Sequence, residues 1–308
     1  MTYSQKLQLI LQLSGLTQEK LAAKIVVSFA TLNSWLNKRS EPRAKAQEKI
    51  DDLYREYSGE KTIPKNILKA KKTQILQKSK KYPNIINTIM SIPDIYQEFQ
   101  LALTYHSNSI EGSMLTRVET AHILFDNALF PNRSLIEHLE AKNHQTALRF
   151  LFDYLALKHP LDEKLILKLH GILLNGINSE AGFYRRAEAR IVGSNIPTAN
   201  YVKIPYLMGK LSKRIANNNK DIVAKSTKIH SEFEKIHPFS DGNGRIGRLL
   251  LVAMLLKQNL PPAIIRQEDK PKYLRYLNIS QTKDDFSLWG EFLCDSILLG
   301  FDILERKI

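Results

Sequence analysis

The sequence has almost no cysteine, since Cys294 is the only one among 308 residues. A single thiol excludes an internal disulfide framework and favours a reducing compartment, so we expect a cytoplasmic protein. The first residues, MTYSQK, lack the apolar run of a signal peptide. The longest apolar run, residues 249–256, is far too short to span a bilayer and predicts a buried helix. We therefore expect no membrane among the partners of this chain.

The sequence also lacks a phosphate-binding loop of the form G-x-x-x-x-G-K-[ST], so any phosphate chemistry must reside in another motif. A hydrophobic content of 43% provides a core for one large or two modest domains. The net charge of +14 is uneven, because +10 of it falls within residues 1–82. This asymmetry predicts a polyanion-binding module joined to a nearly neutral body.

One short segment concentrates chemically useful residues: 237–248 read HPFSDGNGRIGR. Two glycines beside an asparagine let the backbone turn its N–H groups toward an anion. An apolar helix is expected at 245–258, and its positive end would face the same turn. His237 can accept a proton near neutral pH, and Asp241 can hold a divalent cation between phosphates. The segment therefore predicts a site for the phosphates of a nucleotide.

Two other interpretations of this segment stay open. The first is a glycine turn between core helices, in which His237 has only a structural role. The second is a metal site, because His230, Glu234 and His237 share one helical face, although their order differs from H-E-x-x-H.

The segment resembles the Fic motif, HxFx(D/E)GNGRxxR, and matches every defined position. The resemblance covers roughly residues 95–300. It implies transfer of AMP from ATP to a Tyr, Thr or Ser hydroxyl of a protein target, including the chain itself, with release of pyrophosphate. His237 would be the base and Asp241 the Mg²⁺ ligand. The implied phosphate contacts are Gly242, Asn243 (backbone and side chain), Gly244, Arg245 and Arg248, and Tyr273 and Gln281 would line the adenine pocket.

A second motif precedes this one. The residues from Ser107 to Glu111 and Gly112 resemble the family's inhibitory motif, (S/T)xxxE(G/N), in a helix expected at about 98–112. Ser107 and Glu111 are four residues apart and share a helical face. A carboxylate placed against Arg248 would neutralise the arginine intended for the γ-phosphate. The alternative is a helix that merely ends at Gly112 with Glu111 exposed.

Apolar periodicity from residue 83 onward predicts an all-α fold, a Fic helical core within 83–308. Helices are expected at 94–105, 117–129, 135–157, 163–177, 206–217, 221–236, 245–258 and 285–304. Residues 190–202 differ and predict a β-hairpin. The hairpin resembles the Fic flap, which holds the target by strand addition, here through Ile191, Val192 and Gly193. The alternative is an ordinary loop.

Residues 1–57 predict a small helical domain, with helices at 4–13, 18–25 and 29–36. The region resembles the helix-turn-helix of phage repressors, which implies DNA as a partner. The short polar side chains of Ser28, Thr31 and Asn33 would reach base edges. The cationic side chains of Lys38 and Arg39 would contact phosphates. The alternative is a bundle used for dimerisation or docking. Residues 58–82, with eight lysines, are expected to be a basic linker, either solvated or loosely helical.

The favoured function is a self-inhibited adenylyltransferase. A DNA-binding regulator or toxin-antitoxin component with a nucleotide-sensing body is an alternative. Removal of AMP by the same site, with Glu111 positioning water, is another. A homodimer stays open, and the sequence names neither the target nor an operator.

Overall fold

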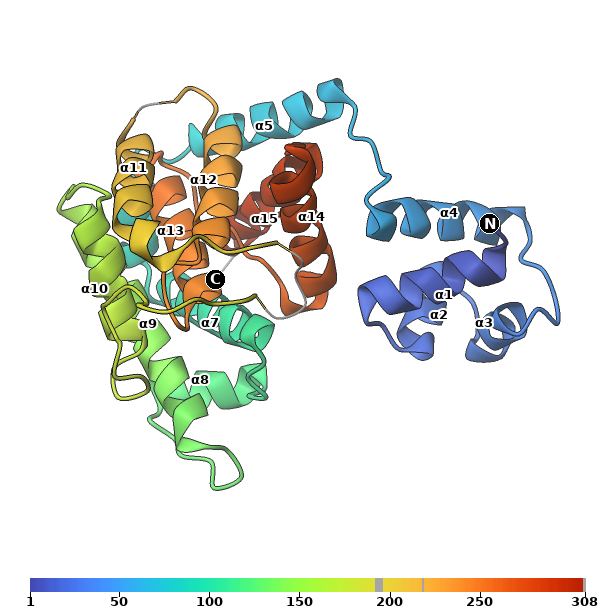
Figure 1. Cartoon of the computed structure of the whole chain (residues 1–308), viewed down its shortest axis with the longest axis horizontal. Helices are drawn as coiled ribbons and strands as arrows, with labels where there is room; N and C mark the ends of the chain where they lie inside the picture. The colour runs from blue at the N-terminus through green and yellow to red at the C-terminus, as the bar shows by residue number, and fades with distance from the viewer. Residues whose placement is uncertain (192–195, 218, 307–308) are drawn as a thin grey trace.

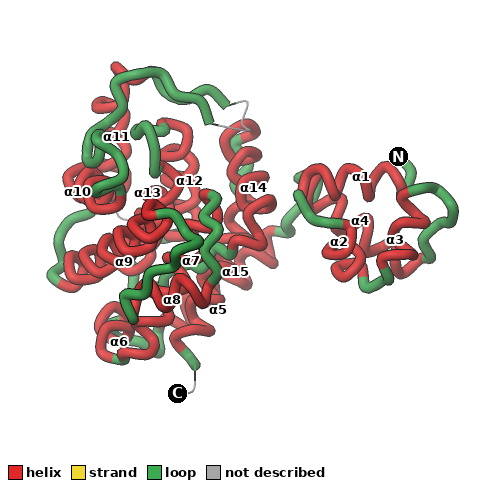
Figure 2. The backbone as a smooth tube through the Cα atoms, turned by 90° about the horizontal axis from the view of Figure 1, so that it is seen from below, coloured by secondary structure: helices red, strands yellow, loops and turns green. Residues whose placement is uncertain are grey.

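The structure is a computed structural model that describes residues 1–191, 196–217 and 219–306. In this part of the chain every regular element is a helix, as the all-α prediction requires (Figures 1 and 2). The helices form a small N-terminal bundle and a larger body. No helix among the described residues is long and apolar enough to cross a membrane.

The N-terminal bundle has four helices around its own core. They are α1 (Tyr3–Ser14), α2 (Gln18–Ile25), α3 (Phe29–Leu36) and α4 (Ala44–Ser58). The core is formed by Leu7, Ile10, Leu21, Ala22, Ile25, Leu32, Trp35, Ile50 and Tyr57. The bounds of α2 and α3 are those expected, because side-chain caps start both helices: Thr17 accepts from Lys20 N, and Ser28 accepts from Thr31 N.

The segment 58–82 is not a linker, which corrects the expectation. Residues Lys65–Ser79 form α5, which packs on α15 (Ser287–Leu304). Several lysines of this segment form ion pairs with acidic residues of the body. The ion pairs are Lys61–Glu291 (3.0 Å), Lys71–Asp295 (2.6 Å), Lys72–Asp221 (2.5 Å) and Lys78–Glu305. Much of the positive charge of this segment is therefore matched within the chain.

The body surrounds one central helix. Its elements are α6 (Ile85–Ser91), α7 (Pro93–Glu111), α8 (Arg117–Phe125), α9 (Leu135–Ala156), α10 (Glu163–Leu173), η1 (Tyr201–Lys203), α11 (Ile204–Ala216), α12 (Ile222–Ile236), α13 (Asn243–Lys257), η2 (Gln267–Asp269), α14 (Lys270–Lys283) and α15. Helix α13 contacts α7, α9, α10 and α12, so it is buried almost along its whole length. The loop before α13 is thereby fixed in the middle of the body.

Two features of the body differ from the sequence expectation. Helix α14 was not expected, because its residues KPKYLRYLNISQTK show a weak apolar period. The described parts of 190–202 contain no strand, and 201–203 form η1. Here Thr198 Oγ1 donates to Ala189 O at 2.6 Å, a side-chain bond between the two described legs of this loop.

The bundle contacts the body through α4 and α14 (Figure 1). Lys272 of α14 forms an ion pair with Glu56 of α4, and the Arg275 guanidinium donates to Ser58 O. Gly59 ends α4 at φ 76°, where a β-carbon would lie 2.2 Å from Ile279 Cδ1. The absence of a side chain at Gly59 therefore permits this close contact.

Candidate active site

His237 ends α12 and starts the loop that leads to α13. It has φ 52° and ψ 62°, the left-handed region that non-glycine residues seldom adopt. The conformation is held on both sides: its N–H donates to Phe233 O at 2.9 Å, and its carbonyl accepts from Arg185 Nε at 2.8 Å. The backbone at His237 is thus fixed by its surroundings, as strained residues at functional sites often are.

The His237 ring is oriented by its own helix. Its Nδ1 lies 3.4 Å from Glu234 O, an acceptor, so this nitrogen carries the proton and Nε2 is left to accept one. Burial lowers the pKa of His237, and the nearby Arg185 lowers it further. The Glu234 carbonyl, Glu111 and Asp241 act in the opposite direction without reversing it. A neutral ring at neutral pH follows from the lowered pKa.

The loop after His237 is closed by Asn243 and Phe239. The Asn243 side chain accepts from Phe239 N at 2.9 Å and donates to Phe239 O at 2.8 Å. Phe239 is buried and stacks on His170, with ring centroids 3.8 Å apart. The Asn243 side chain is therefore committed to the loop, and its expected phosphate contact is not supported. Its backbone N–H lies in the first turn of α13.

The N-terminus of α13 points into this loop. Gly242 precedes the helix at φ 76°, a conformation that glycine adopts without strain. The first N–H groups of any helix lack intrahelical acceptors and carry the positive end of its dipole. Backbone donors at Asn243 and Gly244 therefore face the loop together, as an anion site requires.

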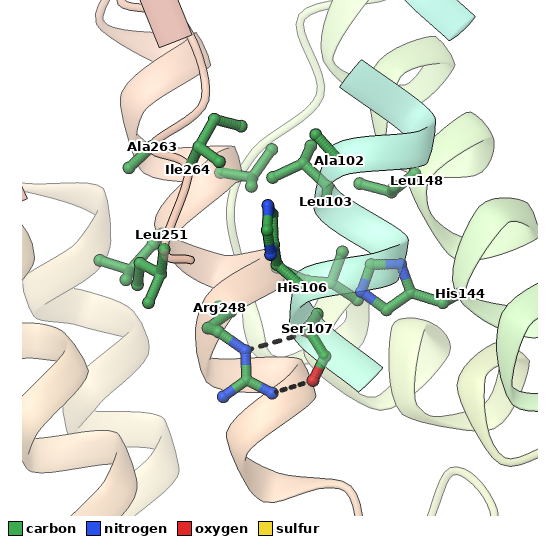
Figure 3. Close-up of a pocket in the computed structure, with 13 residues that line it drawn as sticks. Ala102, Leu103, His106, Ser107, His144, Leu148, Arg248, Leu251, Ala263 and Ile264 are labelled. Carbon is green, nitrogen blue, oxygen red and sulfur yellow. Dashed lines mark hydrogen bonds between the residues drawn. The ribbon is translucent and has the colours of Figure 1, made fainter. Parts of the chain in front are cut away.

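Arg248, one turn further along α13, is bound by α7. Its Nη2 donates to Glu111 Oε1 at 2.6 Å. Figure 3 shows its two bonds to Ser107: Nη2 donates to Ser107 O at 3.0 Å, and Nε donates to Ser107 Oγ at 3.0 Å. Burial opposes the charge of Glu111, but the Arg248 guanidinium outweighs this and lowers the pKa of that carboxyl. The structure thus places Ser107 and Glu111 on Arg248, the arginine that the resemblance to the inhibitory motif implied.

Arg245 faces another way than expected. It is buried, and its Nη1 donates to Glu140 Oε1 of α9 at 2.6 Å. Its Nη2 lies 3.3 Å from Asp241 Oδ2. The expectation that Arg245 would be directed at phosphates is not supported here, because a carboxylate 105 residues earlier in the chain holds it.

Asp241 is exposed, with 55% of its side chain accessible, and Gly242 N donates to its Oδ1. Among the described residues no group of three or more His, Cys, Asp or Glu side chains could hold a metal ion. Mg²⁺ at nucleotide sites commonly takes one or two carboxylates and completes its shell with phosphates and water. A lone accessible carboxylate beside an anion site fits that pattern.

Of the two residues proposed for an adenine pocket, Tyr273 is buried and Gln281 is half-exposed. Tyr273 is 1% exposed, packs against Trp289, and lies with its hydroxyl 2.7 Å from His230 Nε2. Gln281 donates to Ser231 O at 3.0 Å. Tyr273 is therefore a core residue, because its ring packs among aromatic side chains and its hydroxyl has a buried hydrogen-bond partner. This corrects the expectation for Tyr273.

The alternative metal triad is also not assembled. His230 is buried and shares hydrogen bonds with Gly247 O and Tyr273 OH, so both of its ring nitrogens are used. Glu234 Oε1 is buried without a hydrogen-bond partner in the described structure, and burial raises the pKa of Glu234 to about 8. These residues form part of the packing around Arg248.

A small cavity of about 20 Å³ lies behind Arg248 (Figure 3). It is lined mainly by apolar side chains of α7 and α13 together with His106 and His144. A volume of this size holds about one water molecule. The cavity does not provide room for a nucleotide.

Of the three residues expected in the flap, Ile191 lies in a loop. Val192 and Gly193 lie outside the described residues. The loop approaches the site through Arg185, whose Nη1 and Nη2 donate to Ala187 O and Ala199 O. The sequence analysis predicted a role for neither Arg185 nor Glu140, and for Glu140 the sequence carries no signal.

The residues expected to contact DNA lie on and after α3. Ser28 is exposed and caps the helix through Thr31 N, with Thr31 Oγ1 2.8 Å from its hydroxyl. Asn33 bonds Asn37 and Gln18. Lys38 and Arg39 are exposed and have no ion pair in the described structure. Ser28 before α3 and the two cations after α3 are therefore exposed, while Thr31 and Asn33 are half-buried.

Parts of the chain are similar to known families and proteins. Residues 160–255 match the model of the Fic/DOC family, and residues 7–58 match the model of a helix-turn-helix. The protein adenylyltransferase Fic of Nematostella vectensis is 32% identical over 188 residues, which cover 56% of this chain and 42% of that protein. The enzyme of the same name from Aedes aegypti is 28% identical over 213 residues, covering 68% and 42%. The chain thus spans less than half the length of these relatives.

Solved structures agree on the fold. A Fic-domain signalling protein from Bacteroides thetaiotaomicron superposes with a TM-score of 0.66 at 25% identity, covering 77% of this chain and 99% of that one. Fic-1 from C. elegans superposes with a TM-score of 0.64 at 20% identity, covering 93% and 84%. Residues 160–255, which contain the motif, therefore resemble the Fic/DOC family, and residues 7–58, earlier in the chain, resemble a helix-turn-helix domain.

Proposed function

We propose that this chain transfers AMP from ATP to a hydroxyl of a protein and that α7 holds the site inactive. The observation that carries the proposal is the 2.6 Å contact between Glu111 Oε1 and Arg248 Nη2, in the same site as His237. The relatives named protein adenylyltransferase Fic support the reaction class. The proposal extends that class to this shorter chain.

The geometry suits attack of a hydroxyl on the α-phosphorus. His237 Nε2 takes the hydroxyl proton, because Nδ1–H is directed at Glu234 O and the ring is neutral. The hydroxyl oxygen bonds to the α-phosphorus as the bond to the β-phosphate oxygen breaks, so pyrophosphate leaves. Backbone N–H groups at the start of α13 stabilise the developing charge without reorganising. Such a reaction depends mainly on positioning and electrostatics.

Asp241 would hold Mg²⁺, which when bound neutralises phosphate charge. Arg245 fixes Asp241 from one side and is itself fixed by Glu140. Arg245 therefore acts on the nucleotide through Asp241. This assignment replaces the direct phosphate contact that the motif alone implied.

The inhibition follows from the geometry at Arg248. Glu111 and Ser107 occupy the Nε and Nη2 donors of its guanidinium. A γ-phosphate would have to displace a carboxylate that already forms a charge-assisted hydrogen bond. Without that arginine, the triphosphate is not held for in-line attack. Because Glu111 belongs to the same chain, the inhibition is intramolecular.

The experiment is labelling with α-³²P-ATP and Mg²⁺. Glu111→Gly should raise incorporation of AMP sharply. Adding His237→Ala to that variant should lower incorporation by about 10²–10⁴-fold, because a general base is lost. Ser109→Gly is the matched control, since it places a glycine in the same turn of α7 and retains Glu111. Unchanged labelling in Glu111→Gly, or equal labelling in both glycine variants, contradicts the inhibition.

A second function, DNA binding, is favoured by the exposed start of α3 beside Lys38 and Arg39. These cations lack internal partners among the described residues, unlike the lysines of α5. The full chain should bind duplex DNA with affinity that falls steeply as salt rises. Lys38→Gln with Arg39→Gln should reduce the salt slope by about two. Lys71→Gln, a lysine paired with Asp295, is the control, and an equal effect of both changes would argue against this surface.

A further inference from the structure

Arg185 joins three segments of the site. Its backbone N–H donates to Pro238 O at 3.0 Å. Its guanidinium donates to His237 O at 2.8 Å, to Ala187 O at 2.6 Å and to Ala199 O. One buried side chain thus connects the loop after α10, the segment before η1 and the residue that carries the candidate base.

All three acceptors of the Arg185 side chain are neutral carbonyls. Among the residues that the structure describes, no carboxylate lies within ion-pair distance of it. Burying an unpaired charge is costly, so the contacts must be well formed to hold it there. The planar guanidinium presents its donors in fixed directions, whereas a lysine ammonium on a flexible stem does not. The arrangement therefore requires the shape of arginine in addition to its charge.

We propose that Arg185 is a positioning residue for AMP transfer: it fixes His237 and both legs of the 187–199 loop in one relative arrangement. A protein hydroxyl presented beside the described legs of that loop, residues 187–191 and 196–199, then meets the ring of His237. The proposal rests on the proposed function. It also accounts for the left-handed backbone at His237, since the bond to His237 O is one of the contacts that hold it.

The charge of Arg185 adds a second effect. The groups that face the His237 ring are Arg185, Glu111 of α7, and Asp241 of the loop before α13. Arg185 lowers the pKa of His237, in the same direction as burial, while Glu111 and Asp241 raise it. In a chain that lacks Glu111, burial and Arg185 both still lower the pKa of His237, so the ring stays neutral and able to accept a proton.

The test uses the full chain with Glu111→Gly as the parent and adds Arg185→Lys, Arg185→Met or Arg186→Met. Arg186 is the matched control, because it is the adjacent arginine and is exposed. AMP incorporation gives kcat and the KM for ATP, and NMR of ¹³C-labelled histidine gives the titration of His237. Arg185→Lys should lower kcat by about 10²-fold with little change in the KM for ATP, as expected for a misplaced base.

The two Arg185 variants separate geometry from charge. Arg185→Lys should leave the His237 titration in place, and Arg185→Met should move it to higher pH, while Arg186→Met should change neither. Parental kcat in Arg185→Lys overturns the positioning role, and a parental titration in Arg185→Met overturns the effect of charge. If Arg185→Met does not fold by circular dichroism, Arg185→Lys decides. If the parent transfers no AMP, the proposed function fails, while the His237 ring shifts of Arg185→Lys against Arg186→Met still test the positioning.

Discussion

The β-carbon that Gly244 lacks would lie 2.3 Å from Glu111 Oε1, a distance that no side chain tolerates. The same atom would lie 3.1 Å from Arg248 Nη1. Gly244 therefore leaves the space through which the carboxylate of α7 reaches Arg248. Gly244, which the motif suggested for phosphate contact, therefore also permits the Glu111–Arg248 contact that opposes phosphate binding at Arg248.

Gly244→Ala should destabilise the chain by about 1–3 kcal/mol, because the added methyl group overpacks the Glu111 contact. In a Glu111→Gly background the same change should be nearly neutral, since the clashing atoms are gone and alanine favours helix. Urea unfolding of the four chains in this cycle gives the coupling. Equal destabilisation in both backgrounds would place the clash elsewhere.

Glu234 should give the stability of the chain a pH dependence. Burial raises its pKa to about 8, so between about pH 5 and pH 8 the folded chain keeps a proton that the unfolded chain loses. Stability from this group is therefore full at low pH and falls as pH rises, by at most about 1.4 kcal/mol per pH unit. Glu234→Gln should lose less stability than the parent between pH 5 and pH 8. Parallel unfolding free energies across that range would contradict the assignment.

Val26→Gly should stabilise the helix-turn-helix domain. Val26 ends α2 at φ 66° and is 72% exposed, so its β-branched side chain costs strain and gains little burial. Relief of about 1–2 kcal/mol of left-handed strain outweighs the entropy cost of glycine, about 0.5–1 kcal/mol. Thermal unfolding should show the gain. Val27→Gly should be destabilising, because Val27 packs against the core of the bundle.

Tyr105→Phe should weaken the hold of α7 on Arg248. Gln267 of η2 donates to Tyr105 OH at 2.9 Å and, through its backbone, to His106 Nδ1 at 3.2 Å. Losing one hydrogen bond of about 1 kcal/mol should raise AMP labelling about fivefold. Tyr96→Phe, on the same helix and packed on Phe152, is the control. In a Glu111→Gly background Tyr105→Phe should have no further effect, and a rise there would assign it to another step.

Much of the local structure followed from short-range patterns. The bounds of α2 and α3 were predicted because a capping hydroxyl and a helical apolar period specify a helix within a few residues. The spacing of Ser107 and Glu111 predicted a shared helical face, and the resemblance to the inhibitory motif implied its contact with Arg248, which the structure contains. The weak period of α14 gave no such signal, and α5 was recognised as basic but not as a packed helix.

The sequence by itself determined the helical class, the two-domain order and the residues of the phosphate-site motif, because periodicity, caps and motif spacing are local properties of the chain. Only the tertiary structure decided what each polar side chain does. Arg245 is held by Glu140, Asn243 closes its own loop, and Tyr273 enters the core. The Arg185 side chain donates to three carbonyls that lie up to 52 residues away in the sequence. Such partners are selected by packing and desolvation in three dimensions, which sequence spacing does not record.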